Sequence, residues 1–224
     1  MTSIATRFAL STALLVSIAV SSLVFVPAAG AVGNVVISQV YGGGGSASST
    51  YKCDYVELFN RSASSVDISG WSVQYAAATG TSWSKVIIPA ATNLGAGAYY
   101  LIQLQCGATG LDIPVNCVSL SSTSISMAAA SGKVALVMNS TTLTGSGCPL
   151  PATLSDFVGY GSADCFEGTP TAVTSATSAA RRGSAGYQDT DFNANDFSIG
   201  APLPCALPTP TAPSTWGRIK TIYR

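Results

Sequence analysis

Apolar and polar positions alternate along this chain with the two-residue period of β-strands. Residues 54–60 show the pattern most clearly, because Val56 and Leu58 share one face while the opposite face carries Tyr55, Glu57 and a phenylalanine ring. Both faces of that strand are therefore expected to be partly covered. The same periodicity predicts seven short strands and almost no helix, at 35–41, 54–61, 66–75, 85–88, 98–105, 133–138 and 154–160.

The segment 133–138 is almost continuously apolar, which indicates a central strand of a sheet rather than an edge. Connections rich in Gly, Ser, Ala and Asn separate the strands, as turns and surface loops require. Seven short strands joined in this way are typical of an all-β sandwich. What remains after a leader at 1–31 suits one domain of this kind rather than two.

Two neighbouring motifs carry a family resemblance. The run DYVELFN at 54–60 is followed ten residues later by GWSV at 70–73, and together they resemble the lamin tail domain. That resemblance implies an immunoglobulin-like β-sandwich. It is closest to the type found in secreted bacterial proteins, where the domain often precedes an extracellular nuclease or phosphatase domain. Further matching segments, at 35–45, 66–71, 156–161 and 180–182, extend the resemblance over nearly the whole of 32–205.

The first thirty-one residues are expected to be a secretory signal peptide. Arg7 supplies a positive charge, the nineteen residues 8–26 are apolar with scattered Ser and Thr, and Pro27 leads to the small-residue sequence at 29–31. The alternative is an uncleaved membrane anchor, since a segment of that length could just span a bilayer. Because the proline and the cleavage pattern favour export, we expect a secreted or cell-surface protein cleaved after Ala31.

Cysteine usage agrees with export. Six cysteines all follow the leader, and an even number in an exported chain predicts disulfides. None has metal-finger spacing, and the chain has no histidine to complete a mixed zinc site. Several pairings are open to six cysteines, and sequence does not choose among them rigorously. Nearness along the chain favours Cys148 with Cys165 and Cys106 with Cys117, which leaves Cys53 with Cys205.

The charge balance argues against nucleic acid as a partner. Charged residues make up only 9% of the chain, so the surface must be rich in hydroxyl groups. Between residues 32 and 205, six basic side chains stand against ten acidic ones, a net charge of −4. Binding to a phosphate backbone needs clustered positive charge, which this segment lacks.

One segment, 189–197, places oxygen-bearing side chains at alternate positions, as loops that bind hard cations do. A calcium ion there would be held by Asp189, Asp191, Asn193 and Asp196. The match to the helical calcium loop stops halfway, because the glycine and the final glutamate of that loop are missing. The alternative is a structural turn in which the Asx side chains bond backbone groups.

No catalytic arrangement emerges from the sequence. Without histidine there is no Ser-His-Asp or Cys-His arrangement and no histidine metal centre. A pair of carboxylates could in principle supply acid and base, but no motif links two of them. We therefore expect no enzyme activity and no cofactor other than the calcium ion considered above. The carboxylates considered are Asp54, Glu57, Asp156, Asp164 and Glu167.

Two further features favour structural roles. The glycines at 42–45 lack the Lys-Ser or Lys-Thr pair of a phosphate-binding loop, so they predict a flexible connection. Trp71 shares a strand face with Val73 and Tyr75 and is expected in the core. Trp83 lies in a loop-like stretch and is the better candidate for an exposed aromatic.

The end of the chain changes character. Residues 206–215 interleave proline with Thr and Ser, as in an extended linker. A tail at 216–224 carries three positive charges and spaces Trp216, Ile219 and Tyr223 as on one side of a helix. Nine residues make a marginal helix alone, so the tail is expected to order only on a partner or a membrane surface. A disordered end is the alternative.

The expected function is a secreted or cell-surface, non-catalytic module for binding or adhesion. Its partner would be an extracellular protein or an envelope or matrix ligand, with membrane contact only through the tail. The alternative is an accessory subunit that targets an extracellular nuclease or phosphatase encoded elsewhere.

Overall fold

The computed structural model describes residues 33–145, 148–149 and 151–205. Regular structure in these residues is almost entirely β, with two short helical turns, η1 (Ser184–Gly186) and α1 (Asn193–Asp196). The strands are β1 (Val35–Tyr41), β2 (Cys53–Asn60), β3 (Val66–Asp67), β4 (Ser72–Ala77), β5 (Ser84–Ile87), β6 (Asn93–Leu94), β7 (Tyr99–Cys106), β8 (Val118–Ser121), β9 (Gly132–Val137), β10 (Leu154–Tyr160), β11 (Ala179–Arg182) and β12 (Phe197–Gly200).

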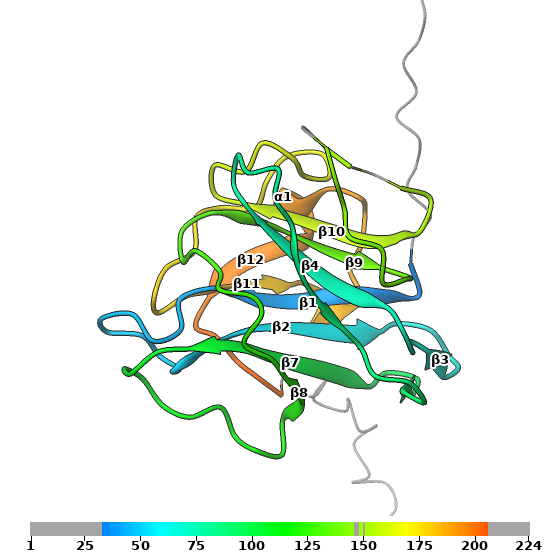
Figure 1. Ribbon diagram of the computed structural model, residues 1–224, viewed down its shortest axis with the longest axis horizontal. Helices are drawn as coiled ribbons and strands as arrows, with labels where there is room; N and C mark the ends of the chain where they lie inside the picture. The colour runs from blue at the N-terminus through cyan, green and yellow to red at the C-terminus, as the bar shows by residue number, and fades with distance from the viewer. Residues whose placement is uncertain (1–32, 146–147, 150, 206–224) are drawn as a thin grey trace, which may run out of the picture.

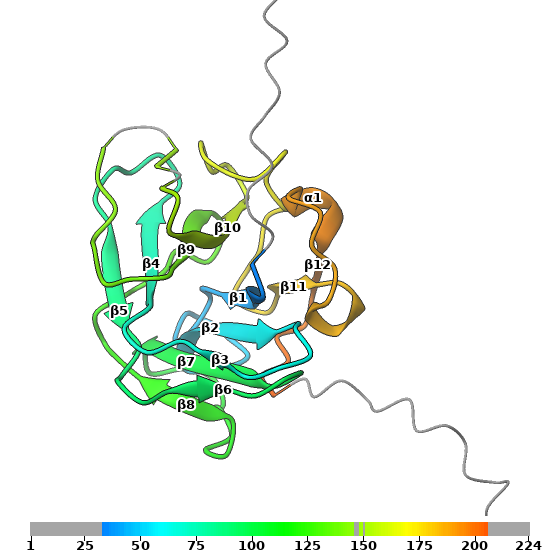
Figure 2. The same cartoon turned by 90° about the vertical axis from the view of Figure 1, so that its right-hand side faces the viewer.

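Two sheets form the layers of the sandwich. The larger has the strand order β12-β11-β1-β2-β7-β8, and the smaller has the order β10-β9-β4-β5. All pairs within them are antiparallel except β7 with β8. Figures 1 and 2 show the four-stranded sheet on one side of the six-stranded sheet. This architecture confirms the predicted all-β, immunoglobulin-like sandwich.

Three predicted segments lie outside the described residues. They are the signal peptide at 1–31, the linker at 206–215 and the tail at 216–224. Across the part of the chain that the structure describes, no helix has the length and apolar character needed to cross a membrane.

The main core lies between the two sheets. Val56 and Leu58 of β2 pack there with Val134 and Leu136 of β9, and all four are fully buried. On the outer face of β2, Tyr55 belongs to a separate buried cluster with Tyr41 and Leu101. The prediction that both faces of this strand are covered is therefore confirmed, as is the central position of β9, which lies between β10 and β4.

The predicted strand at 66–75 is wrong as a single element. It is interrupted between β3 and β4, where Gly70 adopts a positive φ of 74°. The Asp67 carboxylate accepts a hydrogen bond of 2.9 Å from the Ser69 backbone N–H, which forms a local turn. Glycine adopts this left-handed conformation without steric penalty, so the chain turns here before it enters the four-stranded sheet.

Two other predictions need correction. Trp83 is only 9% exposed, because its ring packs edge-on against Phe157 at a centroid distance of 6.1 Å. The glycines at 42–45 form a packed turn rather than a flexible connection, since a Cβ on Gly44 would overlap the backbone of Cys53. The expectation for Trp71 holds, because this half-buried ring packs against the main core.

Disulfides join parts of the domain that lie far apart in the sequence. Each of the six cysteines is paired in the structure. The bridges are Cys53–Cys106, Cys117–Cys205 and Cys148–Cys165.

Only the pairing of Cys148 with Cys165 matches the expectation from nearness along the chain. The predicted pairs Cys106–Cys117 and Cys53–Cys205 are wrong. Cys53 and Cys106 lie directly opposite each other in the antiparallel pair of β2 and β7, so strand register brings them together. This leaves Cys117 to bond Cys205, which fastens the end of the domain to the segment before β8.

The lengths of the closed loops predict unequal contributions to stability. Changing Cys117 and Cys205 together to Ser should lower the free energy of unfolding by about 4.5 kcal/mol, because this bridge spans 88 residues. The corresponding double change at Cys148 and Cys165, which are 17 residues apart, should lower it by about 3 kcal/mol. Denaturant melts without reductant measure both values. A larger loss for the shorter loop would contradict this order.

Candidate functional site

A buried group of charged side chains joins the two sheets near the segment 189–197. We call it the Arg182 cluster, and it consists of Arg182, Asp156, Asp189 and Asp196. The Arg182 side chain, at the end of β11, is fully buried. Its Nη2 lies 2.5 Å from Asp156 Oδ2, and its Nη1 lies 3.1 Å from Asp189 Oδ1 and 3.7 Å from Asp196 Oδ2. One guanidinium group therefore contacts three carboxylates, which come from β10, from the loop between η1 and α1, and from α1 itself.

Backbone groups complete the environment of Arg182. Its Nε donates to the Ile37 carbonyl at 2.7 Å, and Nη1 donates to the Gln188 carbonyl at 3.1 Å. Asp156 in turn accepts a 2.6 Å bond from the Ile37 N–H. Because Ile37 belongs to β1 and Asp156 to β10, these bonds tie the six-stranded sheet to the four-stranded one. The guanidinium carbon also lies 4.5 Å from the ring centroid of Phe197.

Negative charge exceeds positive charge around this cluster, and the pKa values reflect it. Burial, and then the negative charge of Asp156, raises the pKa of Glu167 to about 9. Burial also raises the pKa of Asp156, although Arg182 acts in the opposite direction. Asp156, Glu167 and Asp189 each place an oxygen within 4.8 Å of the other two.

The loop predicted to bind calcium uses its oxygens within the protein. Asp189 accepts from Arg61 at 2.7 Å as well as from Arg182. Asp196 accepts from the backbone N–H and the hydroxyl of Thr190, at 2.9 and 2.8 Å. These bonds run from α1 back to the start of the same loop and close it, which favours the structural interpretation over a cation loop.

Asn193 has a different role from the one predicted for a ligand. Its side-chain oxygen accepts from the Gly159 N–H at 2.9 Å, and its amide nitrogen donates to the Phe157 carbonyl at 2.8 Å. Asn193 thus bonds β10 at the edge of the four-stranded sheet much as a neighbouring strand would. The same amide oxygen also accepts from the Glu167 N–H at 3.2 Å. Satisfying exposed groups at a sheet edge protects that edge from unwanted pairing.

Asp191 is the one predicted ligand that stands apart from this network. It is half-buried, and its backbone has a positive φ of 54°. Burial, and then the charges of Asp189 and Asp196, raises its pKa. Of the four predicted calcium ligands, Asp191 therefore has the side chain that is least engaged in hydrogen bonds within the described structure.

Substitution of Asp191 separates the two interpretations of the loop. Asp191→Asn should leave the melting temperature unchanged in calcium and in chelator, because Asn tolerates the left-handed conformation. Asp191→Ala should lower stability by about 1 kcal/mol equally in both buffers, because alanine is strained at this φ. If calcium raised the melting temperature of the native protein and Asp191→Asn removed that rise, the calcium interpretation would be correct.

The carboxylates considered as acid and base candidates are distributed over separate sites. The structure brings Asp156 and Glu167 together, but Asp54 accepts from the Gly44 and Met127 N–H groups at 2.9 and 2.8 Å elsewhere. Glu57 accepts from the Ser38 hydroxyl and the Cys205 N–H at 2.9 and 3.0 Å. The Asp54 carboxylate thus holds the backbone at Gly44 and Met127, and the Glu57 carboxylate holds Ser38 of β1 and the end of the domain at Cys205.

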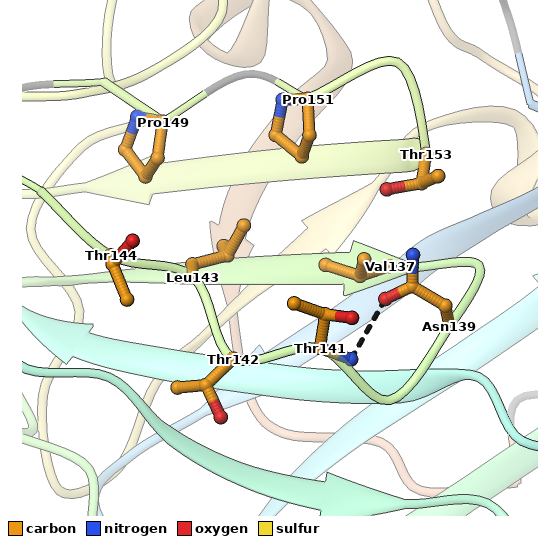
Figure 3. Close-up of a pocket in the computed structure, with 9 residues that line it drawn as sticks. All are labelled: Val137, Asn139, Thr141, Thr142, Leu143, Thr144, Pro149, Pro151 and Thr153. Carbon is orange, nitrogen blue, oxygen red and sulfur yellow. Dashed lines mark hydrogen bonds between the residues drawn. The ribbon is translucent and has the colours of Figure 1, made fainter.

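A pocket of about 440 Å³ lies in the long connection between β9 and β10. Figure 3 shows Pro149, Pro151 and Thr153 on one side of it and the segment 141–144 on the other. None of the lining side chains is charged. They are Val137, Asn139, Thr141, Thr142, Leu143, Thr144, Pro149, Pro151 and Thr153.

Buried contacts fix the walls of this pocket. The fully buried Gln74 of β4 donates to the Thr141 carbonyl at 2.7 Å and accepts from the Leu143 N–H at 2.9 Å. The opposite wall begins at Cys148, which is bonded to Cys165. Val137 and Leu143, which form its apolar floor, pack in the same cluster as Trp83. Sequence patterns missed this pocket, because a run of Thr, Pro and Gly predicts only a loop.

Comparison with known proteins gives one family. A family model described as Lamin Tail Domain matches residues 28–149. No curated protein matches the chain. The match includes β1–β9, most of the long connection and Pro149 of the pocket, whereas Asp156 and the Arg182 cluster follow it in the sequence.

Proposed function

This chain belongs to the lamin tail domain family, and we propose that it is a secreted or cell-surface module that binds a partner without catalysing a reaction. The family is one of non-catalytic, immunoglobulin-like folds. Three disulfides in a domain of this size are consistent with an oxidising, extracellular location. The predicted leader at 1–31 supports the same proposal.

The main support for a non-catalytic role is the use made of the buried acidic groups. Asp156 and Asp189 neutralise Arg182, Glu57 holds the end of the domain, and Asp54 holds two backbone N–H groups. A catalytic carboxylate must instead face a substrate and exchange a proton with it. The surface left for a partner is rich in hydroxyl groups and poor in charge.

We also propose that the domain extends to Cys205, beyond the family match. β10 completes the four-stranded sheet, and β11 and β12 complete the six-stranded one. Gln39 of β1 donates to the Leu203 carbonyl at 2.9 Å and accepts from its N–H at 2.7 Å, so the last residues pack on the sheet. The Cys117–Cys205 bridge fixes that end.

Retention on cell envelopes tests the proposed function. Labelled protein comprising residues 32–205 or 32–224 is mixed with the envelope fraction of the producing cells and sedimented. We expect saturable retention of both forms, and loss of retention after the disulfides are reduced and alkylated. Failure of both to sediment would overturn a binding role, and retention of 32–224 alone would assign binding to the tail rather than to the sandwich.

A further inference from the structure

The pocket between β9 and β10 has the construction of a preformed site. Its volume of about 440 Å³ falls within the range of roughly 300–1,000 Å³ seen for small-molecule sites. Gln74 holds one wall through two backbone hydrogen bonds, and the Cys148–Cys165 bridge anchors the start of the other. The Met138 N–H donates to the Thr153 carbonyl at 2.8 Å and closes the base between them.

The lining combines two kinds of surface. Val137 and Leu143, both buried, give an apolar floor, and the rings of Pro149 and Pro151 face it from the other side in Figure 3. Four threonines and Asn139 complete the lining, and the Asn139 amide oxygen accepts from the Thr141 N–H at 2.8 Å (Figure 3). A hydroxyl group both donates and accepts hydrogen bonds, so these threonines can pair with either kind of polar group.

This lining discriminates between classes of ligand. A ligand with a carboxylate, phosphate or ammonium group would lose water without gaining an opposite charge, because none of the nine lining residues is ionised. A purely apolar ligand would cover the threonine hydroxyls and leave them unpaired, which is also unfavourable. The lining therefore favours an uncharged ligand that presents an apolar face next to groups that donate and accept hydrogen bonds.

We propose that this pocket binds a short, uncharged carbohydrate. A sugar ring presents C–H groups on its faces and hydroxyls around its rim, which match the apolar floor and the threonine rim of the pocket. The proposal rests on the binding role proposed above and specifies one ligand class for it. Val137 and Leu143 belong to the same buried cluster as Trp83. A bound ligand that contacts Leu143 should therefore also change the environment of the Trp83 ring.

A titration monitored by NMR tests the assignment on the mature protein, residues 32–224. Maltose, cellobiose and di-N-acetylchitobiose serve as neutral probes, and glucuronic acid and glucosamine serve as charged ones. We expect at least one neutral disaccharide to shift the methyl signals of Thr142 and Thr153 saturably, with a Kd of about 1 mM or tighter, or about −4 kcal/mol. The charged sugars should produce no saturable shift.

Two arginine variants locate the site. Thr144→Arg places a bulky charge at the exposed rim and should weaken binding of the neutral probe at least tenfold. Thr177→Arg, at an exposed position on a different loop, is the matched control and should leave the affinity unchanged. The proposal is overturned if no neutral disaccharide binds, if the charged sugars bind equally well, or if Thr144→Arg binds like the native protein.

These outcomes remain distinct from failure of the proposed function. If the native protein is retained on envelopes but binds none of the neutral disaccharides, the module binds through another surface and only the pocket assignment fails. If it binds a neutral disaccharide through the pocket but is not retained on envelopes, the ligand class is correct and the envelope is the wrong source of it.

Discussion

Replacing Arg182 with Met should lower the free energy of unfolding by about 3–5 kcal/mol, because it leaves buried carboxylates without their counter-charge. Asp156 and Asp189 both lie against the guanidinium group, and their side chains are 1% and 3% exposed. The change also removes the link from β11 to the Ile37 carbonyl in β1. Domains of this kind are stable by about 5–15 kcal/mol, so much of the total would be lost.

The neighbouring arginine provides a matched control. Arg181 is only half-buried and lies in the same strand, so Arg181→Met should change stability by less than about 1 kcal/mol. Arg182→Lys should fall between the two, because lysine keeps the charge but cannot reproduce the planar set of donors. Urea melts of the three variants measure these differences. Equal effects at positions 181 and 182 would mean that the cluster contributes nothing specific.

Stability should fall as the pH rises from about 4.5 to about 7. Burial raises the pKa of Glu57 to about 7 and that of Asp54 to about 6. Between the ordinary carboxyl pKa and these values, the folded protein keeps a proton that the unfolded chain has released. Unfolding therefore becomes easier with each increase in pH through this window. For Glu57 alone, the shift from 4.5 corresponds to about 3 kcal/mol.

An isosteric change at Glu57 tests the cause of this dependence. Glu57→Gln removes the charge, while its amide oxygen can still accept from the Cys205 N–H and its amide nitrogen can donate to the Ser38 hydroxyl. The variant should be more stable than the native protein at pH 8 and should show a smaller loss between pH 5 and pH 8. Asp112→Asn, at a side chain that is 81% exposed, is the control and should keep the native slope. A native protein that gained stability up to pH 8 would contradict the assignment.

The sequence predicted the strands correctly where the local pattern of apolar and polar residues was strong. The alternation at 54–60 and the apolar run at 133–138 predicted β2 and β9 and the burial of their faces, because the order of apolar and polar residues within a strand determines which face is buried. β11 and β12 were missed, since a segment such as AARR shows neither alternation nor a continuous apolar face. β11 is placed by its pairing with β1, and β12 by its pairing with β11, and both pairings are properties of the tertiary fold.

In the candidate site, too, the sequence predicted local features but not contacts between distant segments. Spacing alone drew attention to Asp189, Asn193 and Asp196, because the turn that they form is local. Arg182 and Asp156 are 26 residues apart in the sequence, and they meet because β11 pairs with β1 while β1 packs against β10. Cys53 and Cys106 likewise depend on strand register rather than on distance along the chain. Sequence therefore located the loop but not the charges that it surrounds.

We expect the buried carboxylates to belong to the scaffold of a non-catalytic binding module. Isothermal titration of residues 32–224 with calcium and with manganese tests this expectation, because a metal site at Asp156, Glu167 and Asp189 would give these groups a chemical role. We predict no saturable heat for either ion, since Arg182 already pairs with Asp156 and Asp189 and the raised pKa of Glu167 favours its protonated form. Stoichiometric binding that disappears in Glu167→Gln would contradict this scaffold role and assign the three carboxylates to metal binding.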